Sequence, residues 1–484
     1  MLAASLALLL ALGAPCVEVL SLSDLHGRVG ALPGLAAAVA PVRARGPSLL
    51  LDAGDSAQGT LEATLTRGRA AVDGLAALGV NAAALGNHDL DFGQAAARER
   101  IAAAPYPTLA ANVRDAATGR LPAWPNLAAS RIFRLPGGPV VGVVGLATPS
   151  TPRQTMPANV AGLRFGKLAP VAEREARALR ARGADIVVAL VHAGGGCREA
   201  GVPDDLSTCD PRGETFALAR ALPPGLVDAI VGGHTHAFTS HRVNGAAVLQ
   251  AGAKGEAVGW VTLCVGEPAR FHLPVRAGGG KAGGAAASDP AVAAAVAPAL
   301  SLARAERERP VGVTLARPLG RGRDRVSPLG ATAAQAARAA MGAEVGLVNA
   351  GALRSSLPAG ELRYGQLYEA LPFDDGLAVV RLTGADLLAV LRALASFRRE
   401  TPQVAGVVFD GASARTCAGE PLDPARTYTV AMNEFLAEGG DGVRGILSRL
   451  PPGAKTVRGD LRLRDATLAW LRTAPESARG KACP

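Results

Sequence analysis

The sequence predicts a layered α/β protein that contains more than one domain. Its 484 residues are too many for one compact core, because a domain usually holds about 100–200 residues. Short apolar runs alternate with alanine-rich segments in the first half, which is the pattern of buried strands separated by helices. Because 49% of the residues are hydrophobic and only 19% are charged, the chain can bury large cores, which excludes wholesale disorder.

The first half contains six predicted strands, with three predicted helices among them. The strands are short apolar runs: 17–23, 48–51, 80–85, 140–147, 185–191 and 226–231. The helices are the alanine-rich segments 32–45, 61–78 and 171–182. The strand pattern ends near 271–274, so we expect a first domain over 17–275.

A second domain is predicted to follow a linker. Residues 277–287 are rich in glycine and alanine, as in a linker or an exposed loop. Ser288-Asp289-Pro290 is a typical helix start before a helical run, so we take 276–310 as linker and connecting helix. The second domain is then 311–484, with expected helices and strands at 331–341, 345–348, 377–382, 385–395 and 427–431.

The N-terminus carries an apolar run, 2–12, of the length of a signal-peptide core. It is too short to cross a bilayer, which takes about 20 residues, and no other stretch has the character of a transmembrane helix. No basic residue precedes Arg28, so the alternative is a buried first strand behind a mis-set start codon. We predict a signal peptide over 1–16, a periplasmic or secreted location and no integral membrane span.

None of the six cysteines forms a C-x-x-C pair, so a structural zinc site is not expected. Cys197 and Cys209 lie in one polar loop. An exported protein would permit a disulfide between them, whereas a cytosolic protein would keep two free thiols. Cys264 lies inside the apolar run 260–265 and is expected to be a small core residue.

The net charge of +10 does not indicate a nucleic-acid partner. The basic residues are mostly scattered arginines, with no block of five or six like charges. Aromatic residues, which stack on bases, make up only 4% of the chain. We therefore expect no nucleic acid as partner, while an anionic small molecule is compatible with the charge.

Polar motifs follow five of the predicted strands. They are Asp24-Leu25-His26, Gly54-Asp55, Gly86-Asn87-His88-Asp89, His192 and Gly233-His234-Thr235-His236. In open α/β sheets, ligands bind beyond the carboxyl ends of the strands, so these motifs are expected to converge on one rim. Asp, Asn and His are ligands of divalent ions such as Zn, Mn, Fe or Co, so the sequence predicts a metal site at this rim.

The ordered set of motifs resembles the calcineurin-like metallophosphoesterase superfamily. The resemblance implies a layered β-sandwich flanked by helices that holds two divalent metal ions, zinc, manganese or similar. One ion would have the ligands Asp24, His26, Asp55 and His236, and the other Asp55, Asn87, His192 and His234. Asp55 would then bridge two ions about 3.5–4 Å apart.

His88 is expected to act on the substrate and not to bind a metal. By the same resemblance it would stabilise charge on the transferring phosphoryl group or protonate the leaving oxygen. Asp91 would orient His88 and favour its charged form; the alternative is a carboxylate at a helix start. Asp89 is expected to support the site or cap nearby backbone and is left out of the catalytic pair.

Three motifs of the second half resemble the C-terminal domain of the 5′-nucleotidase family. They are Asn-Ala-Gly-Ala-Leu-Arg at 349–354, Leu-Pro-Phe at 371–373 and Asn-Glu-Phe-Leu-Ala-Glu-Gly-Gly-Asp-Gly at 433–442. The last motif is long and specific. Both halves together resemble the secreted or periplasmic 5′-nucleotidases, which include bacterial UDP-sugar hydrolases. The resemblance implies a second, α+β substrate-binding domain.

The same resemblance assigns substrate contacts in the second half. Phe373 and Phe435 would sandwich a nucleobase, and Asp441 would accept hydrogen bonds from ribose hydroxyls. Asn349 would touch the base or the phosphate.

The resemblance also implies that arginines clamp the phosphate, with which a guanidinium can make bidentate contacts. Arg354 and Arg323 are the candidates, with Arg325 as the alternative to Arg323. Asp374 and Asp375 follow Phe373 where the family often has Gly and Asn, and this added negative charge disfavours a multiply charged nucleotide such as a triphosphate.

These features predict a metal-dependent enzyme that hydrolyses phosphate esters, with nucleoside 5′-monophosphates as the first choice of substrate. UDP-sugar hydrolysis, 2′,3′-cyclic nucleotide phosphodiesterase activity and thiosulfohydrolase chemistry are alternatives on the same scaffold. Outside the enzymes, the alternative is a secreted nucleotide-binding protein with a dead site. The intact ligand set favours the enzyme. The sequence makes no prediction of oligomeric state.

Overall fold

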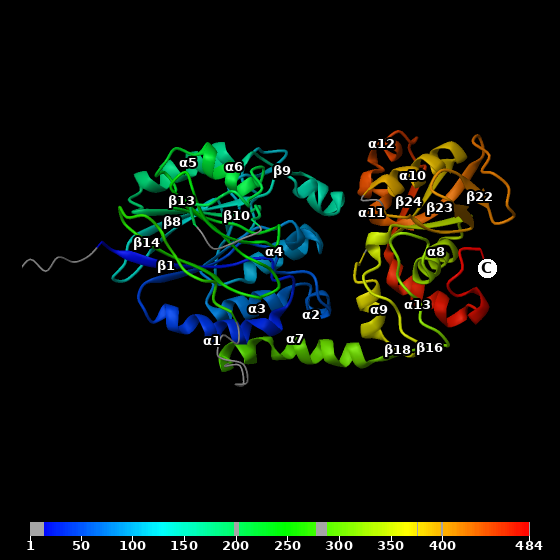
Figure 1. Ribbon diagram of the computed structural model, residues 1–484, viewed down its shortest axis with the longest axis horizontal. Coiled ribbons are helices and arrows are strands. Elements are labelled where there is room, and N and C mark those ends of the chain that lie inside the picture. Colours follow the sequence, from blue (N-terminus) through cyan, green and yellow to red (C-terminus); the bar gives the residue numbers. More distant parts are fainter. Residues whose placement is uncertain (1–13, 198–202, 277–287, 375, 398–399, 484) are drawn as a thin grey trace, which may run out of the picture. The chain divides into compact units, whose positions relative to one another are not determined.

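The computed structural model describes residues 14–197, 203–276, 288–374, 376–397 and 400–483. The chain divides into two compact units, Met1–Leu300 and Ser301–Pro484 (Figure 1). The boundary falls inside helix α7 (Pro290–Glu308), which corresponds to the predicted connecting helix. The expected linker segment 277–287 and most of the expected signal peptide 1–16 lie outside the described residues.

The first sheet of unit 1 contains most of the early predicted strands. Its order is β15 (Arg270–Phe271), β14 (Gly259–Cys264), β1 (Cys16–Leu22), β2 (Ser48–Asp52), β3 (Ala82–Ala84), β4 (Thr108–Leu109) and β6 (Leu127–Ala128). Strands β1, β2, β3, β4 and β6 run parallel, while β14 and β15 are antiparallel additions. The carboxyl ends of the parallel strands therefore lie at one edge of the sheet.

The second sheet of unit 1 has the same property. Its order is β12 (Phe238–Val243), β13 (Ala246–Ala251), β11 (Ala229–Val231), β10 (Ile186–His192), β8 (Val140–Ala147) and β7 (Ser130–Arg134). The four central strands β13, β11, β10 and β8 are parallel, and the outer strands β12 and β7 are antiparallel. A separate pair is formed by β5 (Val113–Asp115) and β9 (Leu163–Phe165).

The two sheets pack face to face because alternate side chains of each strand point to opposite faces. In β2, Leu49 and Leu51 belong to the core between the sheets, whereas Leu50 faces the helices. In β10, Val188 points into the same inner core and Val187 points outward. This alternation gives the β-sandwich that the family resemblance implied.

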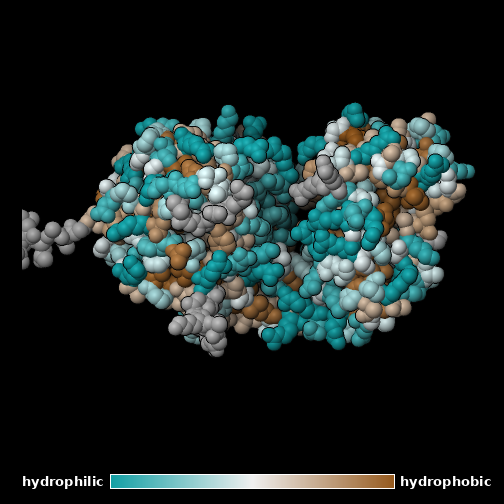
Figure 2. Space-filling view, viewed as in Figure 1, coloured by the Kyte–Doolittle hydropathy of each residue, from teal (hydrophilic) through white to brown (hydrophobic). Residues whose placement is uncertain are grey.

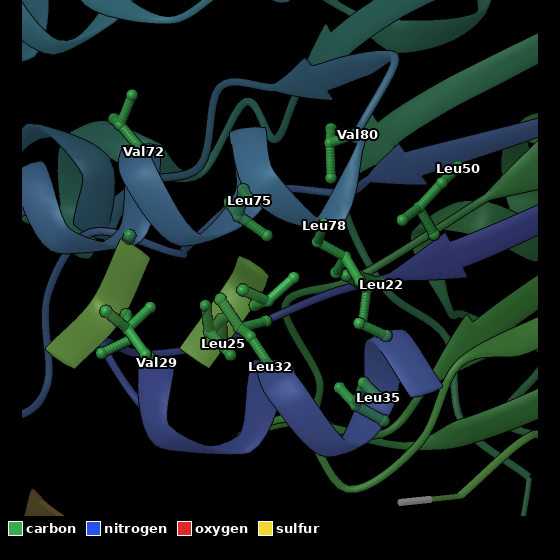
Figure 3. Packing of buried hydrophobic residues seen from close by; sticks show 14 of the residues in the cluster. Leu22, Leu25, Val29, Leu32, Leu35, Leu50, Val72, Leu75, Leu78 and Val80 are labelled. Carbon is green, nitrogen blue, oxygen red and sulfur yellow. The ribbon is translucent and has the colours of Figure 1, made fainter. Parts of the chain in front are cut away.

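Helices cover the outer face of each sheet. The first sheet packs against α1 (Leu32–Arg43), α3 (Arg69–Leu78) and the first half of α7, as the close view of their leucines and valines illustrates (Figure 3). The second sheet packs against α5 (Leu168–Ala181) and α6 (Glu214–Ala221). Further short helices of unit 1 are α2 (Leu61–Leu65) and α4 (Gly93–Ala103).

Unit 2 is an α+β domain, as expected. Its sheet has the order β20 (Gln403–Ala405), β17 (Val345–Val348), β23 (Thr427–Asn433), β19 (Gly376–Thr383) and β24 (Lys455–Arg462), and only β17 and β23 pair in parallel. One face packs against α8 (Pro328–Met341), α9 (Tyr364–Ala370) and α13 (Leu463–Thr473), and the other against α10 (Gly384–Ser396). The remaining elements are β16 (Pro310–Leu315), β18 (Gly360–Arg363), β21 (Val407–Phe409), β22 (Ala414–Thr416), α11 (Glu434–Ala437) and α12 (Arg444–Leu447).

One predicted helix is two helices in the structure. The segment 61–78 breaks between α2 and α3, where Gly68 adopts a left-handed conformation with φ of 82°. A Cβ at this position would lie 2.7 Å from the Ala57 Cβ and 2.9 Å from the Ala57 carbonyl oxygen. The break therefore follows from close contact with the Asp55 loop, which the alanine-rich pattern did not reveal.

All six cysteines form disulfides, in the pairs Cys16–Cys264, Cys197–Cys209 and Cys417–Cys483. The bridge between Cys197 and Cys209 decides between the two alternatives considered for that loop. Cys264 is buried in the core, as expected. It also forms a disulfide that was not predicted, because β1 and β14 are antiparallel neighbours in which Cys16 lies directly opposite Cys264.

The surface is predominantly hydrophilic on the face drawn in Figure 2, where apolar residues form small scattered groups on each unit. Among the described residues, no helix combines the length and apolar character needed to cross a membrane.

Replacing Gly68 with alanine tests the close packing between α2, α3 and the Asp55 loop. A left-handed conformation costs a non-glycine residue about 1–2 kcal/mol, and the contact with Ala57 should add about 1–3 kcal/mol of overpacking. Gly119 is the matched control, because its φ is 68° but a Cβ there would meet nothing within 4 Å. In thermal unfolding, Gly68→Ala should lower the midpoint of unit 1 more than Gly119→Ala; equal shifts would contradict the packing argument.

Candidate active site

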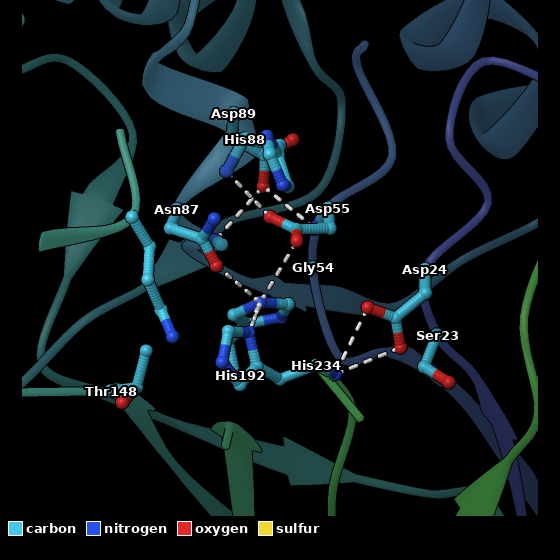
Figure 4. A network of polar contacts seen from close by, with 12 residues as sticks. Ser23, Asp24, Gly54, Asp55, Asn87, His88, Asp89, Thr148, His192 and His234 are labelled. Carbon is cyan, nitrogen blue, oxygen red and sulfur yellow. Dashed lines mark hydrogen bonds and ion pairs between the residues drawn. The ribbon is translucent and has the colours of Figure 1, made fainter. Parts of the chain in front are cut away.

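The five polar motifs lie at the carboxyl ends of the parallel strands, as expected. Asp24 and His26 follow β1, Asp55 follows β2, and Asn87 follows β3 in the first sheet. His192 is the last residue of β10 in the second sheet, and His234 and His236 follow β11. Figure 4 shows side chains from both sheets pointing toward one another at this rim.

The expected ligands form two groups of metal-binding atoms. One group is Asp24, His26 and His236, and the other is Asp55, His192 and His234; within each group the ligand atoms lie within 4.8 Å of one another. Asn87 joins the second group, with its Oδ1 3.1 Å from the Nε2 of His192. The structure therefore brings all seven expected ligands together.

The donor chemistry fits divalent cations. The Nε2 atoms of His26 and His236 face each other at 3.0 Å, and the Nδ1 of His234 lies 3.2 Å from the Nε2 of His192. Asp55 Oδ2 is 3.1 Å from the same Nε2 of His192. Imidazole nitrogens and carboxylate oxygens that converge in this way are the ligands favoured by zinc, manganese and related ions.

Burial controls the protonation of the cluster. It lowers the pKa values of His26 and His234 to about 4, so both imidazoles are neutral, which is the form that binds metals. Burial raises the pKa of Asp24 to about 7. For His192 and Asp55, burial opposes the charged forms, but their mutual attraction outweighs it, raising the pKa of His192 and lowering that of Asp55.

The backbone at the rim is held in an unfavourable conformation. Ten described residues other than glycine have positive φ, and five of them are expected ligands: Asp24, His26, Asp55, His234 and His236. Such conformations are rare and persist only where the surroundings fix them. Backbone bonds from Asp24 N to Gly54 O and from His26 N to Asp55 O, at 2.9 and 3.0 Å, join the first two loops.

Asp89 holds the loop that carries Asp55. Its carboxylate accepts hydrogen bonds from the backbone N–H groups of Gly86, Asp55, Ser56 and Ala57, at 2.9–3.1 Å. The sequence indicated a supporting or capping role, and the structure identifies the four backbone N–H groups that Asp89 caps. Because Asp89 immediately follows His88, the same residue links the β2 and β3 loops.

Asp52 is a supporting residue that the sequence analysis missed. It is buried at the end of β2, and its carboxylate accepts hydrogen bonds from Ser56 Oγ at 2.8 Å and from Gly54 N at 3.3 Å. Burial raises its pKa to about 7, and the charge of Asp89 adds to the effect. An acidic residue closing an apolar strand was the signal available in the sequence.

His88 and Asp91 form a close pair beside the ligands. The Nδ1 of His88 lies 2.6 Å from Asp91 Oδ2, and the other oxygen of Asp91 accepts a hydrogen bond from Thr155 Oγ1 at 2.7 Å. Burial disfavours the imidazolium, but the bond to Asp91 and the charge of Asp55 outweigh it and raise the pKa of His88 to about 9. Thr155 was not predicted, because it lies 64 residues from Asp91 in the sequence.

In unit 2, the structure brings three of the expected substrate residues together. Asn349 follows β17, and its Nδ2 donates to Asp441 Oδ2 at 2.7 Å. Asp441 has a φ of 48°, which fixes it in a tight turn. The Phe435 ring packs on the same motif, because a Cβ at Gly440 would lie 2.4 Å from its Cε1.

The other expected substrate residues form separate contacts. The guanidinium carbon of Arg354 lies 5.8 Å from the centre of the Phe373 ring, which is a cation–π arrangement. Arg323 donates to Glu400 Oε1 at 2.6 Å, so its charge is offset by a carboxylate. The Arg325 carbonyl oxygen accepts a hydrogen bond from Gln403.

Comparisons with known proteins agree with both units. Residues 17–238 match the family model for calcineurin-like phosphoesterase, and residues 310–447 match the model for the 5′-nucleotidase C-terminal domain. The fold and the paired donor groups thus define a metallophosphoesterase joined to a second domain. Both units are similar to those of the 5′-nucleotidases, and the two matches identify the chain as a hydrolase of phosphoric esters.

Individual relatives span most of the chain. Protein UshA of Escherichia coli (strain K12) is 27% identical over 449 residues, covering 82% of this chain and 78% of its own. A 5′-nucleotidase of Vibrio cholerae is 26% identical over 452 residues, covering 83% and 79%. The crystal structure of a 5′-nucleotidase precursor from Thermus thermophilus has the same fold, with a TM-score of 0.71, 24% identity and coverage of 94% and 96%.

Removing the Asp89 carboxylate tests the support of the metal ligands. Asp89→Ala leaves four backbone N–H groups without their acceptor, so the Asp55 loop should loosen and metal affinity should fall about 10–100-fold. Bound metal is measured by elemental analysis after equilibration against buffered zinc or manganese. Asp73→Ala is the control, because Asp73 forms an exposed ion pair with Arg69. Wild-type affinity in Asp89→Ala would refute the supporting role.

Proposed function

We propose that the protein hydrolyses nucleoside 5′-monophosphates to a nucleoside and phosphate, with two divalent metal ions, zinc, manganese or similar. The observation that carries the proposal is the pair of donor groups at one rim, with the His88–Asp91 pair beside them. A protein that only bound nucleotides would need neither the second donor group nor a histidine held by a carboxylate. The alternative of a dead site is therefore disfavoured.

In this proposal each ion takes one donor group, and Asp55 contributes to both. Asp55 is buried in the second group next to His192, and its charge also acts on His26 of the first group. Asn87 completes the second group. Metal ions bound there would supply Lewis-acid charge to a phosphoryl group. The protein's contribution is to hold seven ligands in place, five of them on strained loops, so little reorganisation is needed when a substrate binds.

His88 would act on the substrate. Its Nδ1 is occupied by Asp91, which fixes the ring and leaves Nε2 as the atom that can meet a phosphoryl or leaving-group oxygen. Its backbone N–H donates to Asp55 Oδ1 at 2.7 Å, which ties its position to a proposed metal ligand. The charged form, favoured by Asp91, suits both stabilising negative charge and donating a proton.

The residues of unit 2 would bind the nucleoside. Phe435 and Phe373 are half-buried, so each ring keeps a face for stacking on a base. Asp441, held by Asn349, offers carboxylate oxygens to ribose hydroxyls. Arg354 would contact phosphate, and Arg323 would do so only by sharing or leaving its contact with Glu400.

The disulfides support a location outside the cytoplasm. All six cysteines are paired, and such bridges form and persist in oxidising compartments. We therefore propose that the protein is exported, with the N-terminal apolar run acting as the signal. The signal would end before Cys16 and not at it, because Cys16 belongs to β1 and is bridged to Cys264.

A substrate panel tests the proposed reaction. In the presence of manganese or zinc, kcat/KM for phosphate release from AMP should exceed kcat/KM for three other hydrolyses, each followed by its own product: UDP-glucose to UMP and glucose 1-phosphate, 2′,3′-cyclic AMP to a nucleoside monophosphate, and bis(p-nitrophenyl) phosphate to p-nitrophenol. Sulfate release from an S-thiosulfonated cysteine peptide, which leaves a cysteine persulfide, serves as the test of thiosulfohydrolase chemistry. A metal-loaded protein that releases no phosphate from AMP would refute the nucleotidase proposal, and the preferred substrate of the panel would replace it.

Two substitutions separate metal binding from catalysis. Asp55→Ala should lose both metals and the activity together, because this carboxylate is proposed to contact both ions. His88→Ala should keep its metal content, while kcat falls about 10²–10⁴-fold through loss of acid–base help. Elemental analysis and steady-state kinetics on the same samples give both readouts. An active Asp55→Ala enzyme, or a metal-free His88→Ala protein, would contradict the assignment.

A further inference from the structure

Unit 2 contains an arginine that is completely buried. Arg464, near the start of α13, has no exposed surface and is the largest fully buried side chain among the described residues. Burying a guanidinium is costly unless partners satisfy its charge and its N–H groups. The contacts of Arg464 therefore identify what its burial stabilises.

Those contacts converge on the turn that follows α9. One terminal nitrogen of Arg464 donates to the Leu371 carbonyl oxygen at 3.1 Å, and the other donates to Asp374 Oδ1 at 2.5 Å. The guanidinium carbon lies 5.0 Å from the ring centre of Tyr368 and 5.8 Å from that of Tyr364, both on α9. Arg464 thus packs on the helix and forms hydrogen bonds with both ends of the turn.

Phe373 lies between Leu371 and Asp374, the two residues that Arg464 contacts. On the other side, the backbone N–H of Arg354 donates to the Ala370 carbonyl oxygen at 2.9 Å, and the Arg354 guanidinium stacks on the Phe373 ring. The turn is therefore fixed at 370, 371 and 374, while the Phe373 ring stays half-buried. A ring held in this way loses little conformational entropy when a flat partner stacks on it.

The same contacts offset the negative charge that Asp374 was expected to add beside an anionic substrate. Its carboxylate is paired with buried Arg464, and Arg462 lies 3.9 Å from the same oxygen. The charge of Asp374 is thus compensated within the protein, and the ion pair stabilises the turn.

We propose that Arg464 and Asp374 form a positioning pair that presets Phe373 for stacking on the nucleobase. This inference rests on the proposed function, in which Phe373 contacts the base. Arg464 touches neither substrate nor metal; it acts through the turn and determines affinity for the nucleoside part of the substrate.

The test compares adenosine binding with turnover of AMP. Arg464→Met removes the guanidinium but keeps much of the bulk, and Asp374→Ala, at a partly exposed site, is the milder variant should the first fail to fold. Calorimetric titration with adenosine should give an affinity about tenfold weaker for either variant, in the range of one lost base-stacking contact. The double variant should be no weaker than the weaker single one, because both remove the same support.

Kinetic and stability measurements distinguish positioning from a general structural role. With AMP, KM should rise about tenfold while kcat at saturation stays within about twofold, and bound metal should be unchanged. Arg464→Lys can reach only one of the two acceptors and should lie between Arg464→Met and wild type. Arg458→Met is the control, because Arg458 forms an exposed ion pair with Asp460, and it should match wild type.

Each alternative outcome overturns the inference. Unchanged adenosine affinity in both variants would exclude the positioning role. A parallel loss of kcat and melting temperature with unchanged affinity would leave a purely structural role. Wild-type protein that binds adenosine but does not hydrolyse AMP would refute the proposed nucleotidase function alone, whereas wild-type protein that binds no adenosine would refute this inference.

Discussion

The face-to-face packing of two sheets is the constraint on which the rest of unit 1 depends. Side chains alternate along β2 and β10, so one set fills the space between the sheets and the other meets the helices. A shift of one residue in either strand would turn this pattern inside out. The register therefore also determines which residues begin the loops at the carboxyl ends of the strands. Loops from both sheets meet at one rim because the central strands of each sheet are parallel.

The rim itself is locally unfavourable, and the stable layers beneath it make that possible. Left-handed backbone at Asp24, Asp55 and His234 brings ligand side chains inward over a short distance. Carboxylates accept hydrogen bonds from the backbone N–H groups that these turns leave without backbone partners, most clearly at Asp89. Rigid loops of this kind form the site before metal or substrate binds. The loops must then adopt backbone conformations that an isolated segment would avoid.

Much of this structure could be predicted from local sequence. Buried strands are continuous apolar runs, and the ligands stand in short motifs directly after them. Contacts between distant segments could not be predicted in the same way. The pairing of Cys16 with Cys264 requires β14 to lie antiparallel beside β1, and Thr155 reaches Asp91 only after two loops fold together. Arg464 lies 90 residues from Asp374, where no periodicity connects them. The break at Gly68 likewise depends on a neighbour outside its own helix.

The bridge between Cys16 and Cys264 turns most of unit 1 into a covalent ring. Every proposed metal ligand, from Asp24 to His236, lies on that ring. A protease that cuts a single loop within it opens the ring into one linear chain and releases no fragment. The donors of both groups then stay joined by covalent bonds as well as by the sheets. Covalent separation of the ligands therefore requires two cuts within the ring, or one cut together with reduction of the bridge.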